Sequence, residues 1–289
     1  MADRHILVVG DTILDETVYS NLIGVSLETP TLKAQYDRTE VEFGGASNVV
    51  ENILTLGGRV TYVTVGGTDK YTENYKNWTT DNLNLFFIEE DKENTVKTRY
   101  WVNHGDSQYK QLQINSGLKE ECSDKAFEKL LKICGEQDHV DCVLLVDYSI
   151  NIFSTPERAH KLLEVVKKYN KPIIVSSQLS SNKNKYPWFS GVDFMCMNMT
   201  EASANIEEFE PSDVKMKELA NMLETNVCVT LGDQGALFNH DSKTYYSLPY
   251  KVKSVDSCGA GDAFVAAFSI FCESGNIDLC NKWAALSTT

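Results

Sequence analysis

The sequence Asp256-Ser-Cys-Gly-Ala-Gly-Asp262, followed by Ala-Phe-Val-Ala-Ala-Phe268, is the most informative segment of this 289-residue chain. The small residues Gly259 to Gly261 allow a tight turn in which the backbone can come close to a ligand. The apolar run from Ala263 to Phe271 has no Pro or Gly and predicts a buried helix that begins where the turn ends. The start of such a helix presents free N–H groups and the positive end of the helix dipole, so the segment predicts an anion-binding site.

Asp262 stands in the same turn and has a side chain suited to general-base chemistry. A carboxylate there can take a proton from a hydroxyl that attacks a phosphate held by the amides of the turn. We therefore predict Asp262 as the catalytic base. The predicted backbone donors are Gly259, Ala260 and Gly261. The alternative is a glycine-rich loop with an aspartate that caps a buried helix.

The composition is that of an ordinary globular protein, with 42% hydrophobic and 24% charged residues. The net charge of −14 argues against nucleic acid or an anionic membrane as the main partner. The eight cysteines contain no C-x-x-C pair, so we expect free thiols in an intracellular enzyme. The N-terminus enters a strand at once, which leaves no room for a signal peptide, and no apolar run approaches membrane-spanning length. We expect a cytoplasmic protein.

Two aspartates follow the first predicted strand, Ile6 to Val9. They are Asp11 and Asp15, four residues apart in Gly10-Asp-Thr-Ile-Leu-Asp15. In open α/β sheets ligands bind at the ends of strands, so both are candidates for substrate contact, although solvated loop acids are the alternative. No G-x-G-x-x-G follows the strand, which disfavours a nicotinamide oxidoreductase.

A helix with a glycine-rich entry comes next. Gly44-Gly-Ala-Ser-Asn48 opens a predicted helix from Val49 to Leu56, which Gly57-Gly58 ends. Paired glycines permit close approach of a ligand to the backbone, and Asn48 can both donate to and accept from sugar hydroxyls.

Two segments predict β-structure outside the main layers. The first covers residues 16–43, where Thr17 to Leu22 and Thr31 to Val41 alternate roughly. The second is a hairpin of Thr95–Val102 and Gln108–Ile114.

The rest of the chain alternates helix and strand. The predicted helices are 123–135, 156–168 (with Thr155 as N-cap) and 213–224, and the predicted strands are 60–65, 142–146, 173–176, 194–197 and 227–230. Repeated βα units predict a parallel sheet between layers of helices. There is no linker-like segment and no internal repeat, so we expect one domain over residues 1–289.

The C-terminal motif Asp-Ser-Cys-Gly-Ala-Gly-Asp-x-x-x-Ala-Ala resembles the signature of the ribokinase (PfkB) family of carbohydrate kinases. Gly44-Gly45-Ala46-x-Asn48…Gly57…Gly67 resembles the N-terminal signature of the same family, with Val50 where Ser, Thr or Ala is usual. The resemblance implies a ribokinase-like three-layer α/β/α fold with a mostly parallel central sheet and a small β-lid, formed by residues of about 16–43 and 95–115. It also implies an ATP-dependent phosphotransferase that acts on a carbohydrate hydroxyl, and a homodimer formed through the lid.

Further motifs resemble those of the same family and imply additional site residues. Asn198-x-x-Glu201 is similar to the motif that orders Mg²⁺ through its waters, and Thr230-x-Gly232-x-x-Gly235 to the nucleotide-binding turn. The implied nucleotide-side residues are Asn198, Glu201, Thr230, Gly232, Gly235 and Asn281. The implied or predicted substrate-side residues are Asp11, Asp15, Gly44, Gly45, Asn48, Lys97, Arg99 and Asp147, the last from an Asp-Tyr pair with Tyr148. The cofactors implied are ATP, Mg²⁺ and a monovalent cation such as K⁺.

Within the family the chain is most similar to the heptose 7-phosphate kinases of the ADP-heptose pathway. The shared features are Gly10-Asp-x-x-Leu-Asp15, Glu28-x-Pro30, Lys97-Thr-Arg99 and Asp147-Tyr148. The hairpin cations Lys97, Arg99 and Lys110 favour a phosphorylated sugar, with solvated strand charges as the alternative.

Two motifs of that subgroup are altered. Ser149-Ile-Asn151 stands where Gly-Lys is usual, and Ser176-Ser-Gln-Leu179 where Asp-Pro-Lys is usual. Relatives also continue past Thr289 with a helix and a strand that wall the adenine and complete a monovalent-cation site; a truncated end or a following second domain are both open. Two other functions therefore remain: a degenerate member that binds sugar or nucleotide without turnover, and a kinase for fructose phosphates, hexoses or nucleosides.

Overall fold

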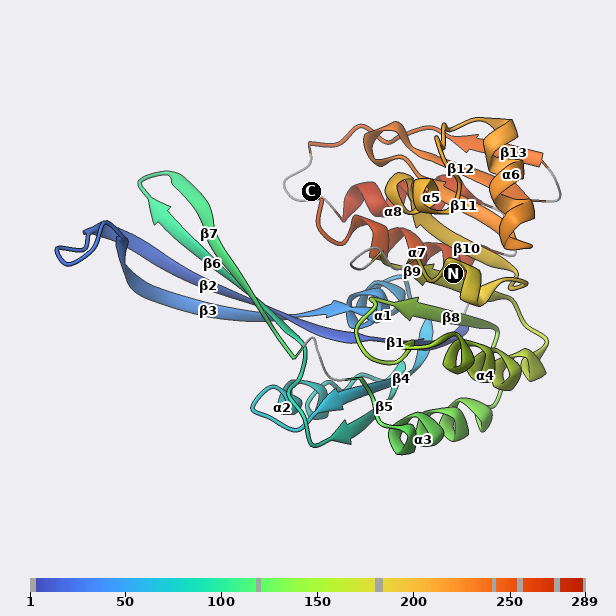
Figure 1. Cartoon of the computed structure of the whole chain (residues 1–289), viewed down its shortest axis with the longest axis horizontal. Coiled ribbons are helices and arrows are strands. Elements are labelled where there is room, and N and C mark those ends of the chain that lie inside the picture. The colour runs from blue at the N-terminus through green and yellow to red at the C-terminus, as the bar shows by residue number, and fades with distance from the viewer. Residues whose placement is uncertain are drawn as a thin grey trace.

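The structure is a computed structural model that describes residues 4–117, 121–179, 184–240, 243–253, 257–272 and 276–287 (Figure 1). Asp256, the first residue of the C-terminal motif, lies outside the described residues. None of the described helices is long and apolar enough to cross a membrane.

A nine-stranded sheet forms the centre of the molecule, in the order β13-β12-β11-β10-β9-β8-β1-β4-β5. Every neighbouring pair from β11 to β5 is parallel, whereas β12 and β13 run antiparallel at one edge. The strands are β1 (His5–Gly10), β4 (Arg59–Gly67), β5 (Leu83–Glu90), β8 (Cys142–Asp147), β9 (Ile173–Ser177), β10 (Phe194–Asn198), β11 (Asn226–Thr230), β12 (Ala236–His240) and β13 (Lys243–Ser247). The predicted mostly parallel sheet is confirmed.

Helices cover both faces of this sheet and complete three layers. Alternate residues of β1 point to opposite faces, so Leu7 and Val9 join one core while Ile6 and Val8 join the other. The first core is covered by α3 (Asp124–Gly135), α4 (Pro156–Val166), α5 (Met199–Asn205) and α6 (Asp213–Leu223). The second is covered by α1 (Ala46–Thr55), α7 (Ala260–Phe271) and α8 (Ile277–Leu286). The short α2 (Thr72–Lys76) lies beside β5 and the base of the small sheet.

Local sequence signals set several helix starts. The hydroxyls of Ser123, Thr155 and Ser212 each accept a hydrogen bond from the amide three residues on, as N-cap side chains do. Thr155 was predicted in this role. Short 3-10 turns stand at Lys167–Tyr169, Tyr186–Phe189 and Gly232–Gln234.

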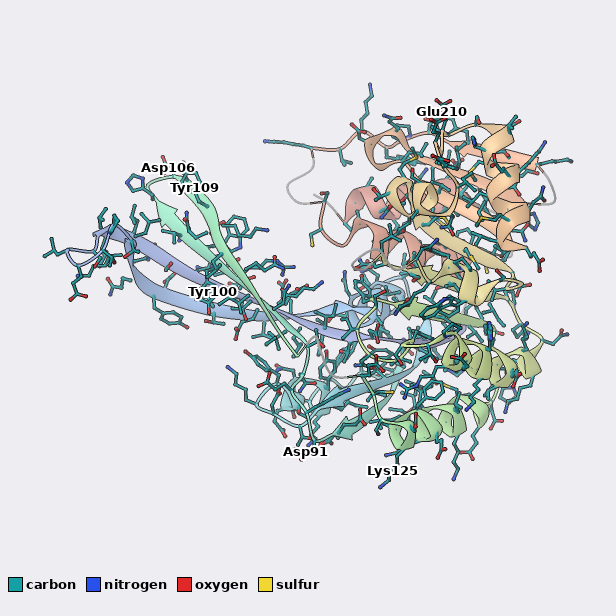
Figure 2. The ribbon with its side chains drawn as sticks, viewed as in Figure 1. Asp91, Tyr100, Asp106, Tyr109, Lys125 and Glu210 are labelled. Atoms are coloured by element: carbon teal, nitrogen blue, oxygen red, sulfur yellow. The ribbon has the colours of Figure 1, made fainter. Side chains whose placement is uncertain are left out.

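The second sheet is the predicted lid, and it projects from the main body as a long arm (Figure 1). Its order is β3-β2-β6-β7, with β2 and β6 parallel. The strands are β2 (Thr12–Val25), β3 (Leu32–Gly45), β6 (Val96–His104) and β7 (Ser107–Ser116). Tyr100 on β6 and Tyr109 on β7 mark this sheet in Figure 2.

The lid strands extend further than the sequence predicted. β2 and β3 continue to Thr12 and Gly45, so the buried ends of the hairpin reach the main body. Register shifts between Tyr19 and Ser20, and between Leu22 and Gly24, interrupt the alternation of polar and apolar residues.

Candidate active site

The first turn of α7 forms the centre of the site. Gly259 precedes the helix in the left-handed conformation, with φ 82°, and a side chain on Gly261 would meet no atom within 4 Å. The N–H groups of a first helical turn have no partner within the helix, so they are available to an anion in the open space above Gly261. This geometry agrees with the anion site predicted from the sequence.

Asp262 brings together three segments that are far apart in the sequence. Asn48 at the start of α1 donates its Nδ2 to Asp262 Oδ2 at 2.8 Å. The hydroxyl of Tyr148, which follows β8, donates to Asp262 Oδ1. Burial raises the pKa of Asp262 above its ordinary value, although both hydrogen bonds act in the opposite direction. The predicted base therefore lies beside the predicted sugar-binding Asn48.

Charges from the base of the lid complete this side. Arg99 Nη1 donates to Asp15 Oδ1 at 2.7 Å, and both side chains remain partly exposed. Lys97 Nζ lies 5.8 Å from the centroid of the Tyr148 ring. The Asp15 charge raises the pKa of Asp262 and the Lys97 charge lowers it, so these groups lie within electrostatic reach of one another.

The two lid glycines make room for protein atoms. A Cβ on Gly44 would stand 2.6 Å from Asp15 Oδ2, and one on Gly45, where φ is 60°, would stand 2.8 Å from the Asp11 carbonyl oxygen. Glycine at these positions therefore lets the lid hairpin close against Asp15 and the end of β1. Close approach of a ligand to the backbone at Gly44 and Gly45 stays a prediction.

The structure corrects the prediction for Asp11. Its side chain is fully buried, and its carboxylate accepts the backbone N–H groups that follow β8. The donors are Tyr148 (3.0 Å), Ile150 (3.2 Å), Asn151 (3.3 Å) and Ile152 (3.0 Å). A carboxylate in this position fixes the 148–152 loop and does not reach the cleft, so the predicted substrate contact for Asp11 is wrong.

Asp147 lines the cleft, but its carboxylate is bonded to protein groups. It is 1% exposed and accepts hydrogen bonds from Ser177 Oγ at 2.7 Å, Lys185 Nζ at 3.2 Å and the amide of Ser149 at 2.8 Å. Burial and the neighbouring Asp11 charge raise the pKa of Asp147 to about 6, whereas Lys185 lowers it. Tyr148 of the same pair lines the same cleft and is bonded to Asp262, and the predicted substrate contact of Asp147 stays a prediction.

Lys185 was not identified from the sequence. It is buried, and it donates to the Phe153 carbonyl at 2.7 Å as well as to Asp147. It lies in an irregular segment 38 residues after its partner, where no periodicity or motif marks it. Only the tertiary structure reveals this contact.

One cleft connects Asp262 to the predicted magnesium residues. Its lining residues are Asp147, Tyr148, Ser176, Gln178, Cys196, Met197, Asn198, Glu201, Thr230, Gly261, Asp262, Phe264 and Val265. The predicted Asn198, Glu201, Thr230 and Gly261 thus share a single space with the base. Gly232, with φ 60°, has open space around it at the end of β11.

Glu201 suits a hydrated cation. Asn198 and Glu201 form a capping box, in which the Asn198 amide donates to Glu201 Oε2 at 2.8 Å and the Glu201 amide donates to Asn198 Oδ1 at 2.9 Å. Tyr186 also donates to Oε2, at 3.3 Å, and burial raises the pKa of Glu201. Among the described residues no three His, Cys, Asp or Glu side chains cluster to hold a metal. The oxygen donors of Asn198 and Glu201 fit Mg²⁺, because this ion keeps several water and phosphate oxygens as ligands.

Two predicted nucleotide residues pack against β13. A Cβ on Gly235 would stand 2.1 Å from the Ser247 carbonyl oxygen, and Asn281 Nδ2 donates to Ser247 Oγ at 2.6 Å. Gly235 and the buried Asn281 thus join the Gly232–Gln234 turn and α8 to β13, and their predicted contacts with the nucleotide stay predictions.

Comparison with known proteins places the chain in a family. A family model described as pfkB family carbohydrate kinase matches residues 3–276. A relative from Campylobacter fetus subsp. fetus, named bifunctional protein HldE, is 27% identical over 284 residues, which are 95% of this chain and 59% of the relative. The protein of that name from Bradyrhizobium diazoefficiens is 26% identical over 287 residues, which are 95% of this chain and 56% of the relative. The chain thus spans little more than half the length of these relatives.

Solved structures share the fold. Phosphofructokinase-2 from Escherichia coli in complex with fructose-6-phosphate has a TM-score of 0.80 at 20% identity, covering 99% of this chain and 94% of that one. The same enzyme in complex with potassium has a TM-score of 0.78 at 20% identity, covering 98% and 91%. The predicted fold class is confirmed.

Proposed function

This chain belongs to the pfkB family of carbohydrate kinases, and we propose that it is a phosphotransferase that acts on an alcohol group of a sugar phosphate. The observation that carries this proposal is the position of Asp262: it lies at the N-terminus of α7, bonded to Asn48 and next to the Asp15–Arg99 pair. The residues proposed as base, anion site and sugar-binding group thus lie close together.

The proposed reaction uses these groups in turn. Asp15 and Asn48 hold the hydroxyls of the acceptor, and the lid closes over them to exclude water. Asp262 accepts the proton of the attacking hydroxyl while that oxygen forms the new bond to the γ-phosphorus of ATP and ADP leaves. The amides of Gly259, Ala260, Gly261 and Asp262 stabilise the charge on the transferring group.

Glu201 and Asn198 serve the nucleotide side of the cleft. They would hold Mg²⁺ through water, and the ion would neutralise charge on the ATP phosphates. Thr230 and Gly232 would contact the nucleotide at the end of β11. The monovalent cation remains a prediction; a related phosphofructokinase-2 was solved with potassium.

Arg99 supports a phosphorylated acceptor. Its guanidinium has five N–H donors on three nitrogens, and Nη1 donates to Asp15. A planar fork with free donors suits a phosphate group, and Lys97 adds a second positive charge on the same strand. The lid base thus offers local positive charge in a chain whose net charge is −14.

We propose heptose 7-phosphate as the acceptor, on the motifs Lys97-Thr-Arg99 and Gly10-Asp-x-x-Leu-Asp15 and on the matches to the HldE proteins. Fructose 6-phosphate is the second candidate, because the similar phosphofructokinase-2 was solved with that compound.

The test is a panel of acceptors supplied with ATP and Mg²⁺ and assayed by ADP release. The panel contains heptose 7-phosphate, fructose 6-phosphate, their unphosphorylated sugars, ribose and adenosine, with a reaction lacking acceptor as the baseline. We expect the best sugar phosphate to exceed its unphosphorylated form at least about tenfold in kcat/KM, since a hydrogen bond to a charged group contributes that much or more. Release no higher than the baseline with every acceptor, in a protein that binds ATP, would favour the non-catalytic alternative.

The exposed lid supports a homodimer as the assembly. Large apolar side chains are exposed on both hairpins: Ile23, Val25, Leu32, Tyr36, Tyr109, Leu112 and Ile114. Soluble monomers rarely expose a large apolar area on one element, so we propose that a second copy of this chain covers the lid.

A further inference from the structure

The predicted base has a donor on each of its two oxygens. Asn48 bonds Oδ2, and the Tyr148 hydroxyl bonds Oδ1. Tyr148 and Asp262 line the same cleft, so the phenol stands in cleft space directly in front of the carboxylate. A general base must accept a hydrogen bond from the hydroxyl that it deprotonates. In this structure a protein hydroxyl takes that place.

The backbone that carries Tyr148 is held firmly. Its amide donates to Asp11 Oδ2, and Asp11 also binds the amides of residues 150–152. The next residue, Ser149, is in the left-handed conformation with φ 56°, and its amide is bonded to Asp147. Since the loop is fixed, the phenol can leave Asp262 only by rotation of its own side chain.

The side chain of Tyr148 has neighbours in the second core and in the lid. It is partly buried and packs against that core, and the Lys97 ammonium of the lid lies over its ring, at 5.8 Å from the centroid. An acceptor that enters between the lid and α7 would therefore come close to the Tyr148 hydroxyl.

We propose that the Tyr148 hydroxyl is a placeholder for the acceptor: it occupies Asp262 Oδ1 in the absence of sugar, and the attacking hydroxyl displaces it. The proposal rests on the kinase function proposed above. Tyr148 forms and breaks no covalent bond; one O–H donor replaces another on the same oxygen. Burial and the Asp262 charge raise the pKa of Tyr148, so the phenol stays protonated and remains a donor.

The placeholder has a consequence for ATP. The proposal implies that the phenol on Oδ1 also keeps water from the position from which Asp262 would activate it against the γ-phosphate. Tyr148 thus limits ATP hydrolysis until a sugar arrives. A residue that merely supports the loop, or one that orients Asp262 during transfer, would not have this effect.

Tyr148→Phe separates these roles because it removes the hydroxyl and keeps the ring. The placeholder predicts that the KM of the sugar phosphate falls about tenfold at nearly unchanged kcat, and that ATP hydrolysis without acceptor rises by a similar factor. Loss of the donor also raises the pKa of Asp262, so the acidic limb of kcat/KM should move to higher pH. Unchanged KM with a lower kcat would show that Tyr148 orients the base and would overturn the proposal.

Tyr71→Phe is the matched control. It also removes a phenol–carboxylate hydrogen bond, from Tyr71 to Glu16 Oε1 at 2.8 Å. Glu16 follows Asp15 on β2, so it points to the opposite face of the strand. We expect none of the three changes in this variant.

A binding measurement keeps the two proposals distinguishable. Calorimetric titration with heptose 7-phosphate and fructose 6-phosphate, in the presence of a non-hydrolysable ATP analogue, should give tighter binding by Tyr148→Phe than by the wild type. Equal or weaker binding would overturn the placeholder. Tighter binding by the variant without turnover in the wild type would overturn the kinase function and leave only the displacement of Tyr148 by a bound sugar. No binding of either sugar phosphate to either protein would overturn both.

Discussion

Asp262 must be ionised to accept a proton from a sugar hydroxyl, so its pKa decides the acidic limit of activity. Burial raises that pKa above the ordinary value, against the hydrogen bonds from Tyr148 and Asn48. As the pH falls through the raised pKa the carboxylate becomes protonated and the base is lost. We expect kcat/KM, measured from about pH 4 to about pH 8, to decline at a higher pH than a solvent-exposed aspartate would give. Activity maintained to the bottom of this range would contradict the assignment.

Arg99 is the residue whose loss should separate phosphorylated from plain acceptors. Arg99→Met removes the guanidinium, so KM for a sugar phosphate should rise about tenfold or more with little change in KM for ATP. Arg38→Met is the control, because Arg38 forms exposed lid pairs with Asp37 and Glu40, which contribute little. An equal loss with unphosphorylated sugars would mean that Arg99 acts by orienting Asp15.

Residue types predicted which segments lie together better than they predicted the direction of side chains. Asp262 and Asn48 were identified correctly as neighbours, because each stands at the start of a helix beside glycines. Asp11 also follows a parallel strand, but it is buried and bonded to the loop after β8. The sequence gives the position of such an acid at a strand end and does not give the side to which it turns.

At the scale of elements, the two glycines at the start of α7 should differ in their tolerance of a side chain. Gly259 has a backbone conformation that disfavours one, whereas Gly261 has open space. Gly259→Ala would place a Cβ in a left-handed position and 2.9 Å from Asn48 Nδ2, so it should lower the free energy of unfolding by roughly 1–2 kcal/mol. Gly261→Ala meets no protein atom and favours the helix, but its methyl group would extend into the cleft. It should leave the unfolding midpoint unchanged or higher and raise KM for ATP.

Denaturant unfolding and steady-state kinetics on both variants check this pair. Equal stability of the two variants would contradict the strained cap at Gly259. Equal ATP affinity of Gly261→Ala and the wild type would contradict the nucleotide position over α7.

Elements were predictable where local signals define them. The apolar runs gave the parallel strands, and Thr155 marked the start of α4. Contacts between distant elements were not predictable. Ser247 of β13 accepts a hydrogen bond from the Asn281 side-chain amide, and its carbonyl oxygen lies close to Gly235. No sequence motif indicates either contact.

At the scale of the whole molecule, the proposed dimer forms through the lid. The exposed apolar side chains on its two hairpins favour association with a second copy. Ile114→Glu should shift a dimer to monomer in sedimentation at micromolar concentration, because it places a charge in the apolar lid surface. Val214→Glu, at an exposed position on α6, should leave the assembly unchanged. A monomeric wild type, or a dimer that tolerates Ile114→Glu, would contradict the lid interface.

The whole account depends on Asp262 as the base that acts at the mouth of α7. The most direct test compares ADP release by the wild type and by Asp262→Asn with the best sugar phosphate, ATP and Mg²⁺. General-base catalysis is worth roughly 10²–10⁴-fold, so kcat of the variant should fall by that factor while its unfolding midpoint and ATP affinity stay the same. Undiminished turnover by a folded Asp262→Asn protein would contradict the account.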